Sequence, residues 1–170
     1  SRLYFSRYAG PDGGGGWFNG PAEGARFFSP SGIAVDAAGN ALIAERAGAI
    51  RMLSPEGRVS TLAGGGGAVS LADGRGVEAG FNGPLGIAVT ATGVAYVVDT
   101  LNHTVRRVDP DGSVTTIAGT PGVFGWADGS GPGAAFREPS GIAADRYGNL
   151  FVADTTNHTI RKVTPAGVVT

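Results

Sequence analysis

One short pattern occurs three times in this chain of 170 residues. The segment Pro-x-Gly-Ile-Ala begins at Pro30, at Pro84 and at Pro139, so successive copies lie 54 and 55 residues apart. A sequence that repeats itself at a period of this size folds as a stack or ring of one supersecondary unit. The repeat also gives a rule for function. A polar residue present in every copy is interpreted as architectural, and a residue present in one copy is the better site candidate.

Each copy has the pattern of four short strands. In the third copy, apolar runs at 141–145 and 150–154 precede an alternating run at 158–163 and a last apolar stretch at 168–170. Turn-forming residues separate these runs, and the whole chain contains 31 Gly and 10 Pro. Short apolar runs between dense turn signals favour an all-β chain of antiparallel hairpins over helices.

Four antiparallel strands of falling hydrophobicity, repeated at this period, are typical of a β-propeller blade. We therefore predict an all-β fold with three four-stranded blades at residues 30–64, 84–119 and 139–170, the last strand of the third blade being cut short. Residues 3–10 align with the fourth strands, so we expect them to form the fourth strand of a preceding blade. The whole chain, 1–170, is then a single propeller segment.

The third copy carries a longer motif. Between Gly148 and Val163 it reads GNLFVADTTNHTIRKV. This motif strongly resembles the NHL repeat, and the other two copies extend the resemblance over essentially the whole chain. The resemblance implies a β-propeller, often six-bladed, that acts as a binding platform. The first copy departs from the pattern, because Glu45-Arg46-Ala47-Gly48 replaces the Asp-Thr-x-Asn-His segment.

The number of copies leaves the ring incomplete. A propeller needs about four to eight blades to surround its axis, so three blades are expected to form half of a six-bladed ring with two open apolar flanks. Large exposed apolar surfaces mark association sites. We expect either a homodimer of 3+3 blades, in which strand 3–10 completes the partner's last blade, or a chain that is part of a longer propeller.

Composition narrows the classes of partner. The formal net charge is −1, with 13 basic and 14 acidic residues spread along the chain, which disfavours nucleic acid. No apolar run is long enough to cross a bilayer, so no membrane partner is expected. The absence of Cys excludes disulfides and thiolate metal sites but leaves the compartment open. A single Lys beside twelve Arg suggests a GC-rich, bacterial source.

The polar residues that recur between copies are interpreted as structural. His103 and His158 occupy equivalent positions, so we expect each to hold its blade, with Asp99 and Asp154 as neighbouring partners. Catalysis or metal ligation by these histidines is the alternative. Asp36 and its third-copy counterpart are expected to cap turns. No cofactor is expected, and a calcium ion held by carboxylates on the axis is the alternative.

The best site candidates lie at one end of the blades. By the parity of the strands, the long connections between blades share an end with the turns that follow each second strand. Residues at this end include aromatic side chains that do not recur between copies, as the anchors of interaction surfaces do. The expected ligand-binding residues are Trp17, Phe18, Arg46, Thr100, Leu101, Phe124, Trp126 and Thr155. Arg46 is the single best candidate, because it is unique to one blade.

These features predict a non-enzymatic interaction module that binds a protein, a peptide or a glycan and that self-associates into a closed ring. The sequence contains neither a Gly-x-Ser-x-Gly elbow nor a His-Glu-x-x-His motif. Two alternatives stay open. One is a metal-dependent propeller hydrolase or lyase, and the other is a designed or evolutionary half-propeller whose only function is assembly.

Overall fold

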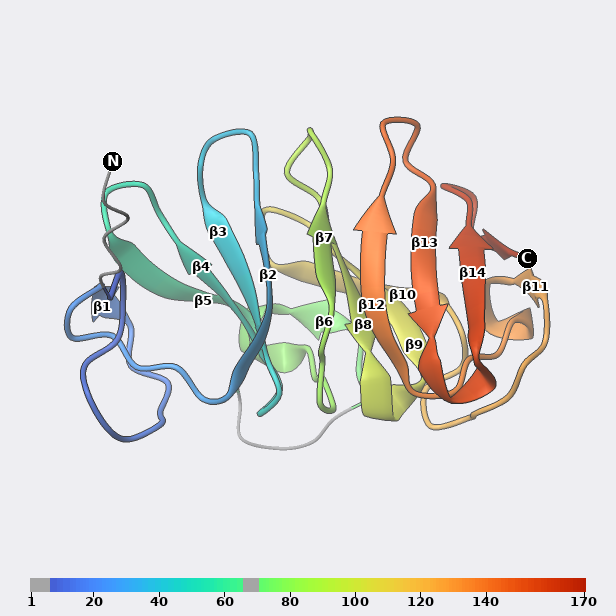
Figure 1. Cartoon of the computed structure of the whole chain (residues 1–170), viewed down its shortest axis with the longest axis horizontal. Coiled ribbons are helices and arrows are strands. Elements are labelled where there is room, and N and C mark those ends of the chain that lie inside the picture. Colours follow the sequence, from blue (N-terminus) through green and yellow to red (C-terminus); the bar gives the residue numbers. More distant parts are fainter. Residues whose placement is uncertain (1–6, 66–70) are drawn as a thin grey trace, which may run out of the picture.

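The computed structural model describes residues 7–65 and 71–170. Three antiparallel sheets of five strands each stand side by side in chain order (Figure 1). We call them blades one, two and three. Blade one contains β1 (Gly20–Pro21), β2 (Pro30–Val35), β3 (Ala41–Glu45), β4 (Ala49–Leu53) and β5 (Arg58–Gly64). Blade two contains β6 (Gly74–Arg75), β7 (Ile87–Val89), β8 (Ala95–Asp99), β9 (Thr104–Val108) and β10 (Ser113–Ala118). Blade three contains β11 (Gly129–Ser130), β12 (Pro139–Ala144), β13 (Leu150–Asp154), β14 (Thr159–Val163) and β15 (Val168–Val169).

Four single-turn 3₁₀ helices lie between these strands: η1 (Gly76–Glu78), η2 (Thr100–Asn102), η3 (Gly131–Gly133) and η4 (Thr155–Asn157). None of the helices in the described part of the chain is long and apolar enough to cross a membrane. The all-β prediction and the three-fold repeat of one sheet are therefore confirmed.

Each blade has one strand more than predicted. The sequence predicts four strands, but the connection that precedes each blade adds a two-residue strand beside the fourth one, as in the pairs Gly20 with Val59 and Gly74 with Val114. In blade two, Asp73 fixes this extra strand, because its carboxylate accepts the backbone N–H and the hydroxyl of Thr116 at 3.1 and 2.9 Å. Two residues are too few to show an alternating pattern, so the sequence gives no signal for them.

The core lies between the blades. One cluster joins blades one and two through residues such as Leu42, Ile50 and Val97, and another joins blades two and three. Phe81 and Phe136, which come from the connections, are 1% and 0% exposed within these clusters. A phenylalanine from each of these two connections therefore fills the space between neighbouring blades.

The predicted strand 3–10 stays a prediction. Residues 3–6 lie outside the described residues, and residues 7–10 have irregular backbone in which the Gly10 N–H donates to the Ala22 carbonyl at 2.8 Å. The predicted half-ring and homodimer likewise concern contacts beyond a single chain.

Candidate functional site

The same buried ion pair occurs in all three blades. An arginine on the third long strand of the blade donates to a carboxylate at the end of the second, with N–O distances of 3.2, 2.9 and 3.3 Å. The pairs are Arg51–Glu45, Arg106–Asp99 and Arg161–Asp154. The second amino group of the arginine holds the connection before the blade: Arg106 Nη2 donates to the Ala72 carbonyl and to Asp73 Oδ1, both at 2.9 Å.

The guanidinium also lies over the connection phenylalanine. Arg106 is 5.2 Å from the centroid of the Phe81 ring, and Arg161 is 5.4 Å from that of Phe136. The hydrogen bonds and the aromatic ring face both compensate the buried positive charge of the arginine. Because these partners belong to the connection, the arginine holds the connection against its blade. Arg106 and Arg161 therefore have the architectural role that their repetition predicts.

The buried carboxylates form hydrogen bonds with groups inside the protein. Asp99 Oδ1 accepts the Asn82 N–H at 2.7 Å, and Asp99 Oδ2 accepts hydrogen bonds from the Asn102 amide and Arg106 at 2.7 and 2.9 Å. Burial raises the pKa of Asp99 to about 6, although these hydrogen bonds and the charge of Arg106 act in the opposite direction. Burial also raises the pKa of Glu45 in blade one. The partners of these carboxylates are arginines and backbone amides, so the expected pairing of Asp99 with His103 does not form.

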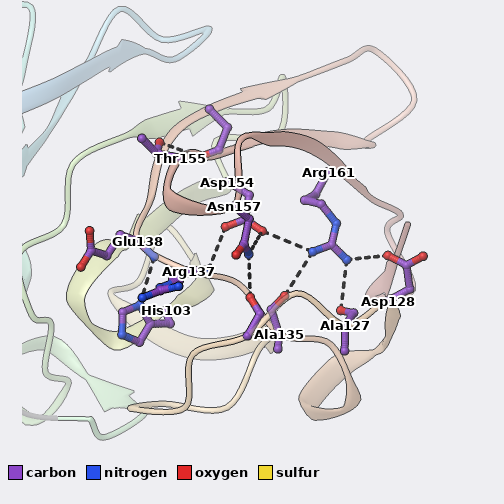
Figure 2. Close-up of polar contacts among 12 residues, drawn as sticks. His103, Ala127, Asp128, Ala135, Arg137, Glu138, Asp154, Thr155, Asn157 and Arg161 are labelled. Atoms are coloured by element: carbon purple, nitrogen blue, oxygen red, sulfur yellow. Dashed lines mark hydrogen bonds and ion pairs between the residues drawn. The ribbon is translucent and has the colours of Figure 1, made fainter.

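His103 instead bridges two blades. Its backbone is left-handed, with φ 59°, and its Nδ1 accepts the backbone N–H of Glu138 from the next connection at 3.1 Å (Figure 2). Burial lowers the pKa of His103, the nearby Arg137 acts in the same direction, and Glu138 and Asp154 oppose it. A neutral imidazole is the state that accepts this hydrogen bond, so the structural interpretation of His103 is supported.

The repeated turn carboxylates are caps. Asp36 accepts the backbone N–H groups of Ala38 and Asn40 at 2.9 and 2.8 Å, and the Asn40 side chain donates to it at 2.9 Å. The hydrogen bond from the Asn40 side chain is the main cause that lowers the pKa of Asp36, and Asp145 repeats the arrangement. Within residues 7–65 and 71–170, no group of three or more His, Asp or Glu side chains is placed to hold a metal ion.

Hydrogen bonds place the connections and the second-strand turns at one end of the blades. The Leu101 N–H donates to the Asn82 carbonyl at 3.1 Å, and the Thr156 N–H donates to the Arg137 carbonyl at 3.2 Å. We call this end the connection face, and it is the lower end of the blades in Figure 1. The turns 36–40, 90–94 and 145–149 lie at the opposite end (Figure 1).

The third connection forms the most distinctive part of the connection face. A hollow of about 370 Å³ is lined by Phe124, Gly125, Trp126, Arg137 and Asn157. Trp126 is 85% exposed and also borders a second hollow of 230 Å³ beside Asn157. The Arg137 guanidinium lies 5.3 Å from the centroid of the Phe124 ring, which leaves a cation and two aromatic rings at one opening. We call this group the Trp126 site.

Asn157 and the buried Arg161–Asp154 ion pair hold the backbone of the Trp126 site in place. The Asn157 amide donates to the Gly125 carbonyl at 2.6 Å and to Asp154 Oδ2 at 2.8 Å (Figure 2). Arg161 donates to the Ala127 carbonyl and to the Asp128 carboxylate at 3.0 and 2.6 Å. The backbone on both sides of Trp126 is therefore held by groups that are themselves anchored in blade three, so the indole is presented on a fixed support.

The other predicted site residues are distributed along the connection face. Phe18, Leu101 and Arg46 are exposed, and Thr155 is exposed beside the hydroxyl of Ser140 at 2.5 Å. Trp17 is half-buried and its ring lies 5.7 Å from that of Phe28. Thr100 is only 6% exposed, and its hydroxyl donates to the Pro139 carbonyl of the next blade at 2.7 Å. Its side chain joins two blades and does not face solvent.

The structure brings together Phe124 and Trp126 of the predicted residues, and it adds two that sequence reasoning missed. Arg137 occupies a position that holds Phe28 in the first copy and Asn82 in the second, so its uniqueness was a usable signal. Asn157 belongs to the repeated motif, and only the structure shows that it reaches the hollow.

The family model described as NHL repeat matches residues 136–163, the third blade. Over 92 residues the chain is 42% identical to Protein SUPPRESSOR OF QUENCHING 1, chloroplastic, of Arabidopsis thaliana, which covers 54% of this chain and 9% of that protein. It is 37% identical over 92 residues to human NHL repeat-containing protein 2, which covers 52% of this chain and 13% of that protein. The chain thus spans only about a tenth of the length of these relatives, and the NHL-repeat resemblance is confirmed.

Solved structures share the fold. An auxiliary nutrient binding protein from Bacteroides thetaiotaomicron superposes with a TM-score of 0.69 and 24% identity, covering 81% of this chain and 37% of that one. At this identity the similarity concerns the arrangement of the sheets.

Proposed function

Because the chain is built from NHL-type β-propeller blades, we propose that it is a non-enzymatic interaction module that binds a peptide segment of a partner protein at the Trp126 site. The observation that carries this proposal is Trp126, whose ring is 85% exposed at the mouth of two adjoining hollows. Exposing a ring of this size to water is unfavourable unless it anchors a ligand, and tryptophan is enriched among residues that dominate binding energy.

The composition of the Trp126 site defines the chemistry of its ligand. Trp126 and Phe124 offer apolar faces, and Arg137 offers guanidinium N–H donors that suit a carboxylate. The hollow of 370 Å³ has room for one or two side chains. A peptide in which an apolar side chain adjoins an acidic one fits this combination.

The experiment uses a synthetic peptide array that varies apolar and acidic positions, read with the fluorescently labelled chain. We expect the wild-type chain to select peptides in which the two kinds of residue adjoin. Trp126→Ala should weaken binding of the selected peptide by at least about thirtyfold, the equivalent of about 2 kcal/mol for an anchor residue. Arg46→Ala tests whether the ligand extends along the connection face to the best candidate from the sequence.

Tyr147→Ala is the matched control. Tyr147 is also a ring with high exposure, 68%, but it belongs to the turn 145–149 at the opposite end of the blade. Equal binding by Trp126→Ala and the wild-type chain would reject the Trp126 site. Selection of oligosaccharides on a parallel glycan array, with no selection of peptides, would reject the peptide as ligand class.

Self-association is the second part of the proposal. The outer flanks of blades one and three expose large apolar side chains, including Ile33 at 67% and Ile160 at 71%. We infer that two copies associate into a closed ring that covers these flanks. Size-exclusion chromatography with light scattering should give twice the chain mass of 17.0 kDa. A mass equal to one chain at every concentration would reject self-association and leave peptide binding to be judged by the array.

A further inference from the structure

The outer flank of blade three carries side chains whose counterparts in the other blades are buried. Ile50 in blade one and Val105 in blade two are 0% exposed, because the next blade covers them, whereas the equivalent Ile160 is 71% exposed. Phe151 is 42% exposed, whereas its blade-one counterpart Leu42 is 3% exposed. The outer flank of blade three therefore exposes the kind of side chains that, in blades one and two, are covered by the following blade.

The backbone of this flank has the same character. A Cβ on Gly32 would lie 2.3 Å from the Leu85 carbonyl oxygen of blade two, and a Cβ on Gly86 would lie 2.7 Å from the Ser140 carbonyl oxygen of blade three. Glycine is required at these two positions because the backbone at the start of β7 or β12 in the next blade approaches so closely. At the equivalent Gly141, among the described residues a Cβ would meet only the Ala153 side chain, at 3.5 Å. Gly141 leaves room for an approaching strand.

Two polar side chains show the same difference between blade two and blade three. Thr100 donates its hydroxyl to the Pro139 carbonyl of the next blade, and His103 accepts the Glu138 N–H from the connection to that blade. Their counterparts Thr155 and His158 are exposed on blade three. Within the described residues, the His158 side chain has no hydrogen-bond partner, whereas Thr155 bonds within its own blade.

The outer flank of blade one supplies what blade three lacks. Ile33 is 67% exposed, whereas its counterpart Ile87, which packs against blade one, is 7% exposed. Ile33 borders a hollow of 350 Å³ together with Phe27, Ile43 and Leu53. In the two cores between blades, the counterparts of Phe27, Ile43 and Leu53 pack against side chains of the preceding blade. The hollow beside Ile33 is the corresponding place on blade one.

The start of β2 in blade one also presents the matching polar groups. Ser29 has a φ of 55°, close to the 48° of Glu138, whose N–H donates to His103. Pro30 is exposed, whereas its counterpart Pro139 is buried and its carbonyl accepts from Thr100. The described flank of blade one thus exposes the groups whose counterparts in blade three contact the preceding blade.

We propose that the flank of blade three binds the flank of blade one of a second copy through the contacts that join consecutive blades within the chain. Thr155 then donates to the Pro30 carbonyl of the second copy, and His158 accepts its Ser29 N–H. Gly141 leaves room for β2 of the second copy to approach. This inference rests on the proposed self-association and specifies its surfaces: each joint uses two different flanks, and a ring of two copies contains two identical joints.

Two variants, each altering one flank, test this pairing by sedimentation velocity. Gly141→Val fills the space on blade three, and Ile33→Asp places a charge on the flank of blade one. Both positions tolerate the change in the isolated chain, since a Cβ on Gly141 makes only an ordinary van der Waals contact with Ala153 and Ile33 faces solvent. Each variant alone should associate about tenfold to a hundredfold more weakly at every joint. Gly133→Val is the matched control, because a Cβ there meets nothing within 4 Å and Gly133 lies in η3, away from both flanks.

Mixing the two variants gives the decisive result. An equimolar mixture restores one joint, between the intact flank of blade three in Ile33→Asp and the intact flank of blade one in Gly141→Val. We therefore expect a one-to-one complex in the mixture that neither variant forms alone. Circular dichroism and urea unfolding midpoints serve to check that each variant is folded.

Three results would overturn the proposal. Gly141→Val could associate like the wild-type chain, Ile33→Asp alone could dimerise, which would mean that like flanks pair, or the mixture could remain monomeric. Peptide binding at the Trp126 site is measured on the same samples. A wild-type chain that is monomeric but binds peptide would reject the proposed contact between two copies and leave the proposed peptide binding intact. A chain that associates but binds no peptide would reject peptide binding and leave the contact between copies intact.

Discussion

Replacement of Phe136 by Ala should show how much stability the contact between blades supplies. The Phe136 ring is 0% exposed, lies in the core between blades two and three, and has the Arg161 guanidinium at 5.4 Å from its centroid. Truncation of a buried phenylalanine costs about 3–5 kcal/mol, and loss of the cation–π contact adds about 0.5–2 kcal/mol. We expect the free energy of unfolding to fall by about 4 kcal/mol or more.

Phe27 provides the matched comparison. It occupies the equivalent position in blade one, with the Arg51 guanidinium at 5.5 Å, but it is only partly buried because it borders the open hollow of that flank. Phe27→Ala removes the same atoms from a half-covered site, so we expect a loss of about 2 kcal/mol or less in the dilute chain. The two variants thus differ in burial and little else.

The assay is urea unfolding followed by circular dichroism at low protein concentration, with the slope of the transition compared between variants. A difference of about 4 kcal/mol corresponds to a lower Tm by roughly 8–16 °C in a domain of this size. Phe136→Leu, which retains apolar volume, should lose less than the alanine variant. Equal losses for Phe136→Ala and Phe27→Ala in the dilute chain would refute the view that the joints between blades carry the stability.

Three further predictions concern residues within the blades and at the contacts between them. Arg106→Met should cost about 3–5 kcal/mol of unfolding free energy in urea titrations, because it leaves a buried carboxylate unpaired, whereas Arg107→Met, on the same strand but partly exposed, should cost less than about 1 kcal/mol. Since burial lowers the pKa of His103, folding opposes its protonation, and its contribution to stability is present above about pH 6.5 and is lost as the pH falls below that value. The wild-type chain should therefore lose unfolding free energy more steeply than His103→Asn on acidification, and parallel pH profiles would contradict this account. Gly86→Val should lower the Tm, because a Cβ there meets a backbone oxygen at 2.7 Å, whereas Gly141→Val should leave the Tm of the dilute chain nearly unchanged.

The period of the sequence was enough to predict the repeated sheet, because turns and apolar runs at fixed intervals are local signals. Phe81 could also be placed between blades, since an apolar residue at one position of every connection has no other common use. The fifth strand of each blade could not be predicted, because it depends on Asp73 meeting Thr116 across 43 residues of sequence.

The site was harder to predict than the fold. Uniqueness within the repeat selected Trp126, which lies beside two hollows, and the same rule would have found Arg137. Thr100 recurs as Thr155, so this rule did not select it; it was chosen from its place in the turn. Whether that hydroxyl faces solvent or the next blade depends on the packing of two blades, and sequence position alone does not contain this information.

We propose that the outer flanks of blades one and three are the two halves of one joint. A crystal structure of the associated chain tests it most directly. We predict a ring of two copies in which Ile160 of one copy packs beside Ile33 of the other, with the Ser29 N–H within hydrogen-bond distance of His158 Nδ1 across each joint. Copies that associate through the Trp126 site or through the turns at the opposite end, with both flanks still exposed to solvent, would contradict it.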